Sequence, residues 1–229
     1  MPSSPLTVVI PTLNESAIIA DAVSAVRANW PAARVVVADG NSSDDTVVLA
    51  EAAGATTISV SARSRGTQLN EGARASDSDW ILFLHADTRL TPEAVHAAES
   101  YMNRDDGGLA MFRIQFKDST LMLRFSAWWT RFDSVFTRFG DQGILIRRSF
   151  YLELGGFNAW PLFEDVDFVR RARARHRVDV LPASVVTSSR RFRRHGPLRQ
   201  QLRNGRLLIQ FLCGADPRRL AQSYPAMKK

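Results

Sequence analysis

The chain has 229 residues, of which 45% are hydrophobic and 23% are charged. This composition is that of an ordinary globular domain, and it excludes collagen, low-complexity and disordered chains. A chain of this length buries about 70% of the surface that its unfolded form exposes, so it needs neither disulfides nor a structural metal to fold.

Cysteine content and hydropathy limit where the protein works. Its one cysteine, Cys213, cannot form an internal disulfide and leaves no cysteine pair for a zinc cluster or a redox centre. The start of the chain lacks the basic and apolar regions of a signal peptide, and no apolar run reaches the roughly 18 residues of a membrane span. We expect a cytoplasmic protein, either free or bound peripherally at the inner face of the membrane.

The net charge of +7 is concentrated in the second part of the chain. Before Arg147 there are 12 basic and 17 acidic residues, whereas from Arg147 onward there are 18 basic and 6 acidic residues. An anionic partner is therefore expected. Nucleic acid, membrane phosphate and a diphosphate-bearing substrate all fit this charge.

The first ninety residues alternate short apolar runs with helical patterns. The runs predicted as strands are Leu6–Ile10, Arg34–Ala38, Thr56–Val60 and Trp80–Leu84. The segments predicted as helices are Asn14–Ala28, Asp44–Ala53, Arg65–Ala75 and Pro92–Asn103. Because the strands are continuously apolar, they fit a parallel sheet that is buried on both faces. This order predicts a doubly wound α/β arrangement whose ligands bind at the carboxyl ends of the strands.

Beyond residue 108 the pattern is mixed. The predicted elements are a strand at Leu109–Phe116, a long helix at Thr120–Phe139, a strand at Gly143–Arg147, a helix from Glu164 to Arg177, edge strands at Val178–Leu181 and Ser184–Thr187, and a helix at Leu198–Leu212. No linker or internal repeat is visible. We expect a single α/β domain over residues 1–229, with a mostly parallel central sheet flanked by helices.

Polar residues directly follow three of the predicted strands. Asn14 and Glu15 follow the first strand, Asp39 follows the second and Asp87 the fourth. Since the carboxyl ends of parallel strands share one edge of a sheet, these residues point to one crevice. Glu15 has a second interpretation as a helix cap, and Asp39 has one as an Asx-turn residue that satisfies its own backbone.

Asp87 ends the apolar segment WILFLHAD, where a buried carboxylate must be paired or bind a cation. An oxygen ligand suits Mg²⁺ or Mn²⁺, which take one or two protein carboxylates and fill their remaining positions with phosphate and water. His85 lies two residues earlier, on the same side of the strand. It is either a second metal ligand or a hydrogen-bonding residue at the strand end.

A second acidic cluster begins the predicted helix in FEDVDFVRRARARHR, where Glu164, Asp165 and Asp167 precede several arginines. Acids in the first turn and bases in the last turn would complement the helix dipole. The preceding segment GGFNAWPLF looks instead like the wall of a pocket. Two adjacent carboxylates also perturb each other's ionisation, which is one way to tune a general base.

Four motifs in this order resemble glycosyltransferase family 2, whose members have the GT-A fold and transfer a sugar from a nucleotide diphosphate. The motifs are VVIPTLNE, VVVADGNSSDDT, LFLHADT, and GGF followed by FEDVDFVRRAR, and they span residues 6–175. The segments SRGTQLNEGA, GDQG and SSRRFRRHG further resemble a bacterial subgroup often linked with arsenosugar biosynthesis. The resemblance implies a nucleotide-binding half at residues 1–108 and an acceptor-side half at residues 109–229.

The resemblance also implies roles for individual residues. It places in the nucleotide pocket Pro11, Thr12, Asn14, Glu15, Asp39 and Arg65, with Asp39 on the base or ribose. It makes Asp87 the metal-binding carboxylate of the family's Asp-X-Asp motif, in which His85 replaces the first aspartate. It makes Asp165 the general base, oriented by Glu164.

The implied reaction is an in-line displacement at the anomeric carbon of the sugar, with inversion. The acceptor is either a small molecule or a lipid-linked one, and Mg²⁺ or Mn²⁺ is expected to bind only together with the nucleotide donor. His85 stands where many members have an aspartate, which predicts weak metal binding. Ala38 also stands where many members have an aspartate, so the identity of the nucleotide is not predicted. Two alternatives are a nucleotidyltransferase and a non-catalytic basic adaptor that binds nucleic acid or a membrane through residues 190–206.

The densest cationic run in the chain consists of Arg190, Arg191, Arg193, Arg194 and His195. This run is either solvated or serves as a clamp for the donor diphosphate on the acceptor side. No nucleic-acid-binding motif accompanies it, so we do not expect nucleic acid as a partner.

The predicted helix Thr120–Phe139 carries a broad apolar stripe and, on another face, Arg124, Arg131 and Arg138 at intervals of seven. Core packing with a basic edge is one interpretation. The alternatives are docking on a lipid headgroup layer that presents a lipid-linked acceptor, and a surface for homo-oligomer formation.

Overall fold

The apolar segments of the first half form the parallel part of one central sheet in the computed structural model, which describes residues 5–61, 64–117, 120–188 and 197–223. The strands are β1 (Leu6–Thr12), β2 (Arg34–Asp39), β3 (Thr56–Ser59) and β4 (Trp80–Phe83). β1 lies between β2 and β4, and β3 follows β2, with every neighbour parallel. The four strands predicted for this half are therefore confirmed.

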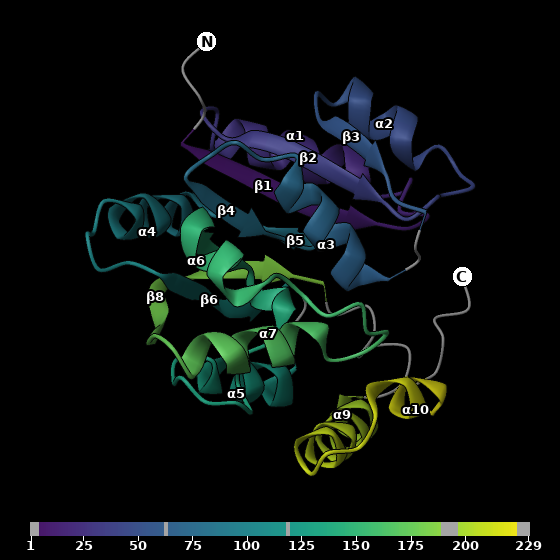
Figure 1. Cartoon of the computed structure of the whole chain (residues 1–229), viewed down its shortest axis with the longest axis vertical. Helices are drawn as coiled ribbons and strands as arrows, with labels where there is room; N and C mark the ends of the chain where they lie inside the picture. The colour runs from purple at the N-terminus through teal and green to yellow at the C-terminus, as the bar shows by residue number, and fades with distance from the viewer. Residues whose placement is uncertain (1–4, 62–63, 118–119, 189–196, 224–229) are drawn as a thin grey trace.

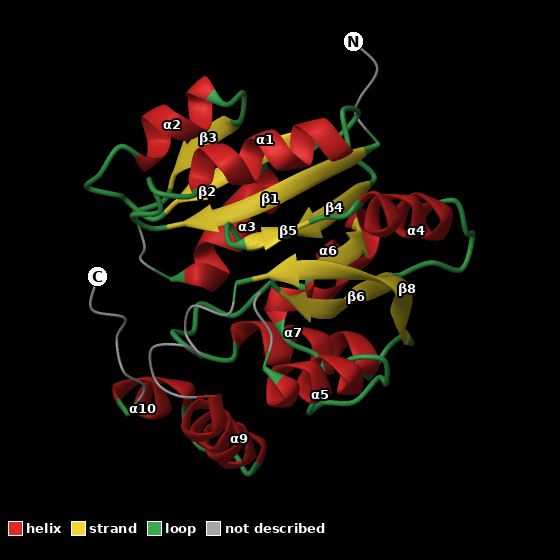
Figure 2. Cartoon of the chain, turned by 180° about the vertical axis from the view of Figure 1, so that it is seen from behind, coloured by secondary structure: helices red, strands yellow, loops and turns green. Residues whose placement is uncertain are grey.

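Helices cover both faces of this part of the sheet (Figures 1 and 2). They are α1 (Ile19–Asn29), α2 (Thr46–Ala52), α3 (Arg65–Arg74) and α4 (Pro92–Met102). Successive strand residues enter opposite cores, so that Val8 packs in one cluster with residues of α1 and α4, and Val9 in another with residues of α3. This two-sided burial explains why the strands are apolar at consecutive positions, and it confirms the doubly wound arrangement.

The remaining strands make the sheet mixed. They are β5 (Thr88–Arg89), β6 (Leu109–Phe116), β7 (Ile144–Arg147) and β8 (Val178–Thr187). The order across the sheet is β3-β2-β1-β4-β7-β6-β8-β5. β7 is antiparallel to both β4 and β6, so β4 and β6 run in the same direction and their carboxyl ends lie at the same edge.

The prediction of two edge strands after residue 177 is wrong. Val178–Thr187 is one strand, and it lies inside the sheet between β6 and the two-residue β5. The pairing of β8 with β6 shifts register between Met111 and Arg113. This irregularity lets β8 continue past Pro182, which has no N–H to donate. Arg113 donates to the Pro182 carbonyl at this irregularity.

The first helix begins at Ile19 rather than at Asn14 as predicted. Asn14 has a φ of 54°, in the left-handed region. Its N–H donates to Ser42 Oγ at 2.7 Å, and its side-chain oxygen accepts the Ser43 N–H at 2.8 Å. These contacts hold the residues after β1 as a loop against the turn that follows β2.

The long helix predicted over Thr120–Phe139 is wrong, because α5 covers only Leu121–Trp129. Arg138, which is 1% exposed, donates to the backbone carbonyls of Phe112 and Phe132 at 3.3 and 2.9 Å. A buried guanidinium needs such acceptors, and the carbonyls of a continuing helix would be occupied by their own backbone. The chain therefore leaves the helix and folds around this side chain, which is not part of a basic edge.

The other helices are α6 (Arg148–Leu154), α7 (Glu164–Arg173), α9 (Pro197–Leu212) and α10 (Pro217–Gln222), together with the 3-10 turn η1 (Gly140–Gln142). Of these, α6 and α7 pack on strands β7 and β8, α9 packs against α5, and α10 packs against α9. α7 ends at Arg173 and not at Arg177 as predicted. α9 and α10 lie at the end of the molecule opposite α2 (Figure 1). None of the helices in the described ranges has the length and apolar character that crossing a bilayer requires.

Candidate active site

The carboxyl ends of β1, β2 and β4 bring together the polar residues predicted to follow these strands. Thr12 ends β1 in register with Asp39 at the end of β2, and Pro11 pairs with Ala38 one step earlier. The segment that carries His85 follows β4, the other neighbour of β1. The predicted nucleotide residues thus lie at one edge of the sheet.

Asp39 is 2% exposed and lies at the centre of this edge. Its Oδ1 accepts hydrogen bonds from Thr12 Oγ1 at 3.2 Å and from the Ser42 hydroxyl, and its Oδ2 accepts the Ser42 N–H at 2.7 Å. Asp39 thus accepts a backbone N–H of its own turn, as considered from the sequence, but three residues on rather than the two of an Asx turn. A carboxylate accepts about four hydrogen bonds, so the three that come from described residues leave it one further acceptor position among them.

Two side chains that the sequence interpretation missed also hold this edge. Gln68 of α3 donates to the carbonyls of Thr12 and Ala38 at 2.5 and 2.9 Å. Thr46 Oγ1 accepts the Glu15 N–H at 2.8 Å, which fixes Glu15 in the loop before α1. Gln68 could have been identified from the sequence, because a glutamine next to Leu69 on the buried face of a predicted helix must find hydrogen-bond partners.

Asp165 comes to the same edge from the second half of the chain. Its Oδ2 accepts the Gly140 N–H at 2.6 Å, and its Oδ1 accepts the Val166 N–H at 2.8 Å. A Cβ added at Gly140 would lie 3.0 Å from Asp165 Oδ2 and 3.2 Å from His85 Nε2. His85 and Asp165 therefore converge on Gly140, where a larger residue would displace one or both of them. The role of this glycine was not predicted from the sequence.

Glu164 lies next to Asp165 in sequence and is 5% exposed. Burial and the neighbouring Asp165 carboxylate raise the pKa of Glu164 to about 7, against the opposing effect of Arg65 at 3.9 Å. Gly66 allows α3 to approach this region, since a Cβ there would lie 2.1 Å from the Asn158 carbonyl oxygen. Arg65, which was predicted to line the nucleotide pocket, therefore lies beside Glu164 of the acidic pair.

The residue before the acidic pair has an uncommon backbone conformation. Phe163 has a φ of 63° and a ψ of 20°, in the left-handed region that bulky residues rarely adopt. Its ring stacks on Phe211 of α9 at a centroid distance of 5.0 Å, and Trp160 contacts the same Phe211 ring edge-on. α9 therefore supports the turn that presents Glu164 and Asp165.

Asp167 is part of the structure of α7 rather than of the crevice. It is 2% exposed and accepts a hydrogen bond from Asn158 Nδ2 at 2.8 Å. It also forms ion pairs with Arg170 and Arg171 at 3.1 and 2.8 Å. Of the three acids in this motif, Asp167 is the one whose carboxylate is fully engaged in holding the helix to the preceding loop.

His85 and Asp87 are the residues predicted to hold a metal ion, and both are half-buried. The Asp87 carboxylate interacts electrostatically with the Arg89 guanidinium. No group of three or more His, Cys, Asp or Glu side chains in these parts of the chain is placed to hold a metal. One imidazole and one carboxylate therefore fit Mg²⁺ or Mn²⁺ only where phosphate and water supply the other ligands.

The cationic run of Arg190, Arg191, Arg193, Arg194 and His195 lies outside the described residues. Its role at the diphosphate or the acceptor stays a prediction.

The comparison with known families decides the class of this site. A family model described as Glycosyl transferase family 2 matches residues 7–152, which is most of the chain. The chain belongs to this family. Membership confirms that the protein is a glycosyltransferase and sets aside the nucleotidyltransferase and the non-catalytic adaptor. The match includes the motifs at the ends of β1, β2 and β4 but stops before Glu164 and Asp165.

Similar proteins agree with this assignment. Protein RfbJ of Shigella flexneri is 36% identical over 94 residues, which cover 41% of this chain and 71% of RfbJ. A solved mannosyltransferase of Pyrobaculum calidifontis, in complex with GDP-Man and Mn²⁺, has a TM-score of 0.74 at 15% identity and is matched over 95% of this chain and 67% of its own.

Two further solved structures have the same fold. Glucosyl-3-phosphoglycerate synthase of Mycobacterium tuberculosis, in complex with Mn²⁺, UDP-Glc and phosphoglyceric acid, has a TM-score of 0.66 at 17% identity, over 93% of this chain and 81% of its own. TarS 1–349 of S. aureus has a TM-score of 0.64 at 16% identity, over 92% of this chain and 66% of its own. The chain thus spans about two thirds of TarS 1–349 and of the mannosyltransferase. These likenesses confirm the GT-A fold.

Proposed function

We propose that this glycosyltransferase moves a sugar from a nucleotide-diphosphate donor to an acceptor hydroxyl with inversion, and that Asp165 is its general base. The observation that carries the proposal is the position of Asp165, whose Oδ2 is held by the Gly140 N–H at the point where His85 also arrives. A general base must be fixed close to the reacting atoms, and open α/β sheets bind their ligands at the carboxyl ends of the strands.

The donor nucleotide is proposed to bind between the strand ends and α3, in the half that covers residues 1–108. Asp39 keeps one acceptor position that would receive a hydrogen bond from the base or ribose. The other residues assigned to this pocket are Pro11, Thr12, Asn14, Glu15 and Arg65. The solved relatives that contain GDP-Man and UDP-Glc support this class of donor. Residues 109–229 would then form the acceptor side.

In the proposed step, the acceptor oxygen bonds to the anomeric carbon while the bond from that carbon to the diphosphate oxygen breaks. Asp165 takes the acceptor proton, and the electron pair of the broken bond leaves with the diphosphate. Each Asp165 oxygen accepts one backbone N–H, from Gly140 or from Val166, so the carboxylate is oriented and still has lone pairs for the proton. A single displacement of this kind inverts the anomeric carbon.

Glu164 is proposed to position Asp165 rather than to act as a second base. With its pKa raised to about 7, chiefly by burial, Glu164 is partly protonated at neutral pH. A neutral Glu164 repels the Asp165 carboxylate less than an ionised one would. Arg65, at 3.9 Å from Glu164, connects this pair to the donor side of the crevice.

His85 and Asp87 would hold Mg²⁺ or Mn²⁺ together with the donor diphosphate. When bound, such an ion neutralises the charge that develops on the leaving diphosphate. Because the protein supplies one carboxylate and one imidazole, metal binding should depend on the nucleotide. Mn²⁺ is present with a nucleotide sugar in the mannosyltransferase and in the phosphoglycerate synthase.

A screen of nucleotide sugars tests the proposed function. The protein is incubated with UDP-sugars and GDP-sugars, with Mn²⁺ or with a chelator, and the released nucleotide is measured. We expect slow hydrolysis of one donor class that requires the metal, and an inverted anomeric carbon in the product, as determined by NMR. Release of a nucleoside monophosphate, or retention of configuration, would contradict the proposal.

A further inference from the structure

Four aromatic side chains that follow one another along α5 and its C-terminal turn are exposed rather than packed in the core. This aromatic cluster consists of Phe125, Trp128, Trp129 and Phe132, which are 44–61% exposed and contact one another at centroid distances of 5.2–5.9 Å. The interpretation of the stripe as core packing is therefore wrong for these residues. A contiguous exposed apolar patch of this kind marks an interaction surface.

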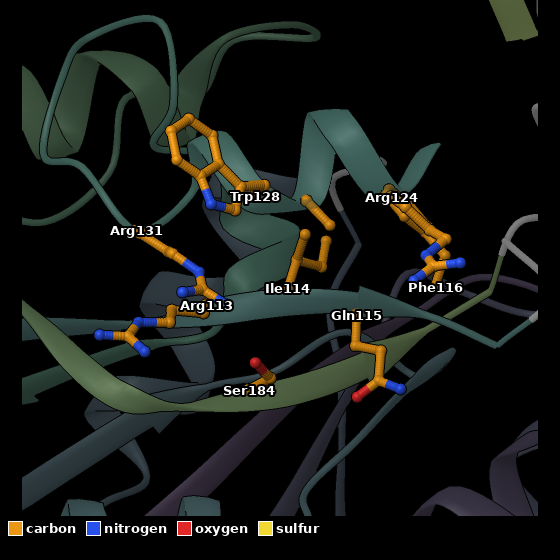
Figure 3. Close-up of a pocket in the computed structure, with 9 residues that line it drawn as sticks. Arg113, Ile114, Gln115, Phe116, Arg124, Trp128, Arg131 and Ser184 are labelled. Atoms are coloured by element: carbon orange, nitrogen blue, oxygen red, sulfur yellow. The ribbon is translucent and has the colours of Figure 1, made fainter. Parts of the chain in front are cut away.

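A pocket lined by arginines opens beside the aromatic cluster. It has a volume of about 430 Å³, and its lining includes Arg113, Arg124, Trp128 and Arg131 but no acidic residue of the described chain. Figure 3 shows the side chains from α5 and its C-terminal turn above the strand β6, which carries Arg113. The Arg113 Nε atom is buried, and no described residue accepts a hydrogen bond from it. Guanidinium groups in this setting suit a phosphate-type anion.

We propose that the aromatic cluster and this arginine pocket form one surface that docks on a bilayer containing anionic phospholipids. A lipid phosphate would enter the pocket while the aromatic rings insert among the lipid headgroups. Trp128 joins the two parts, since it lines the pocket and contacts Trp129 and Phe132 of the cluster. Aromatic rings next to arginines have the composition of interfacial helices, and an anionic leaflet attracts each cation near its surface.

The charge of this surface argues against a second copy of the chain as its occupant. A symmetric contact would place Arg113, Arg124 and Arg131 of one protomer opposite the same three arginines of the other. Helix α9, which packs against α5, contains arginines but no acidic residue, so it supplies no counter-charge either. An anionic bilayer supplies the charge that the protein lacks here.

The docking surface is continuous in sequence with the candidate active site. Arg138 holds the segment after the aromatic cluster through bonds to the Phe132 carbonyl and the Gln142 side chain. That segment leads to Gly140, whose N–H holds Asp165. Docking itself is independent of the proposed base. The connection would bring an acceptor held at the membrane close to Asp165. This expectation about the acceptor rests on the proposed function.

Flotation with vesicles tests the docking. The full chain is mixed with vesicles of phosphatidylcholine alone, or of phosphatidylcholine and phosphatidylglycerol in equal amounts. We expect binding to the anionic vesicles, weaker binding as salt is raised, and little binding to the neutral vesicles. The double variant Trp128→Ala with Trp129→Ala should bind the anionic vesicles at least about tenfold more weakly than the unmodified chain. The double variant Arg124→Gln with Arg131→Gln should bind about 25-fold more weakly, at about fivefold for each cation.

Matched controls separate this surface from general effects of charge and hydropathy. Leu152→Ala removes an apolar side chain that is 58% exposed on α6, and Arg34→Gln with Arg74→Gln removes two cations from β2 and α3. Both should bind the anionic vesicles nearly as the unmodified chain does.

A second readout needs no variant, because it uses the native tryptophans. Trp30 and Trp80 are buried, whereas Trp128 and Trp129 are 44% and 46% exposed. Phospholipids brominated in their acyl chains should therefore quench the fluorescence when the protein is bound. Failure to bind anionic vesicles, absence of quenching, or equal loss in the control variants would overturn the proposal. So would a dimer in solution that the aromatic double variant dissociates.

Discussion

The two sides of the proposed active site are held by contacts of different kinds. Asp39 is held by Ser42, three residues further along the chain, and by Thr12 of the adjacent strand. Asp165 is held by Gly140, and the turn before it is supported by Phe211 of α9. The proposed donor side thus depends on side-chain hydrogen bonds at the ends of buried strands, and the proposed base depends on a 3-10 turn and on aromatic packing against α9. Changes around α9 should therefore affect turnover more than donor binding.

The largest effect in this comparison is expected for Gly140→Ala. The added methyl group would press on Asp165 Oδ2 and on His85 Nε2. Both groups would have to move by a few tenths of an ångström. Since misplacing a catalytic group by about 1 Å costs about 100-fold, turnover should fall by more than about tenfold. Gly205→Ala in α9 is the matched control, since a Cβ there meets nothing within 4 Å, and it should leave turnover unchanged. Steady-state kinetics with the identified donor measure both, and normal turnover in Gly140→Ala would show that this glycine does not shape the site.

A smaller loss is expected for Phe211→Leu, which keeps an apolar side chain but removes the ring that stacks on Phe163. Turnover should fall about tenfold, since the turn that presents Asp165 loses its support. Leu220→Ala, in the same hydrophobic cluster, should lower stability by about 2–5 kcal/mol and leave turnover of the folded protein intact. Thermal unfolding and kinetics on both variants separate positioning from stability. If both variants lost turnover in proportion to their loss of stability, Phe211 would have no separate role in positioning Asp165.

The donor side is tested by Asp39→Asn. This change removes a charge and one acceptor from the carboxylate that bonds Thr12 and Ser42. Donor affinity should weaken about tenfold, which is the value of a hydrogen bond to a charged group, while turnover at saturating donor stays close to normal. Asp77→Asn, an exposed aspartate paired with Arg34, serves as the control. Calorimetric titration with the nucleotide gives the affinities, and unchanged binding in Asp39→Asn would remove Asp39 from the nucleotide pocket.

The smallest effect concerns pH and Glu164. Burial raises the pKa of this carboxyl from its ordinary value of 4.5 to about 7 in the folded protein. The folded state therefore binds more protons than the unfolded state between these pH values, so stability falls as pH rises through this window and stays lower above it. Glu164→Gln removes this loss, and its Tm should exceed that of the unmodified chain by more at pH 8 than at pH 5. The same difference at both values would mean that the pKa of Glu164 is not raised.

Much of the first half could be predicted from the sequence because its determinants are local. Strand residues such as Val8 and Val9 enter opposite cores, which leaves a continuous apolar run for each buried strand. Asp39 could be placed at the crevice because it directly follows such a run. The start of α1 was misplaced because the left-handed backbone of Asn14 depends on Ser42 and Ser43, which belong to another turn.

The second half was predicted less well because long-range contacts override its local pattern. The apolar stripe over Thr120–Phe139 has helical spacing, yet burial of Arg138 against the Phe112 carbonyl ends the helix early. Gly140 carries no local signal of its role, since the groups that a side chain there would strike come from the segment after β4 and from α7. The family resemblance pointed to Asp165 as the base, which stays a proposal, but it gave none of the contacts that hold this side chain.

The central claim is that Asp165 takes the proton of the acceptor hydroxyl, and Asp165→Asn tests it most directly. Asparagine keeps the size of the side chain and can still accept the Gly140 N–H, but it is not a base. Transfer should fall about 100-fold or more, in line with general-base contributions, while calorimetric titration should give a donor affinity close to that of the unmodified chain. Near-normal transfer by this variant, with the donor bound as before, would contradict the account.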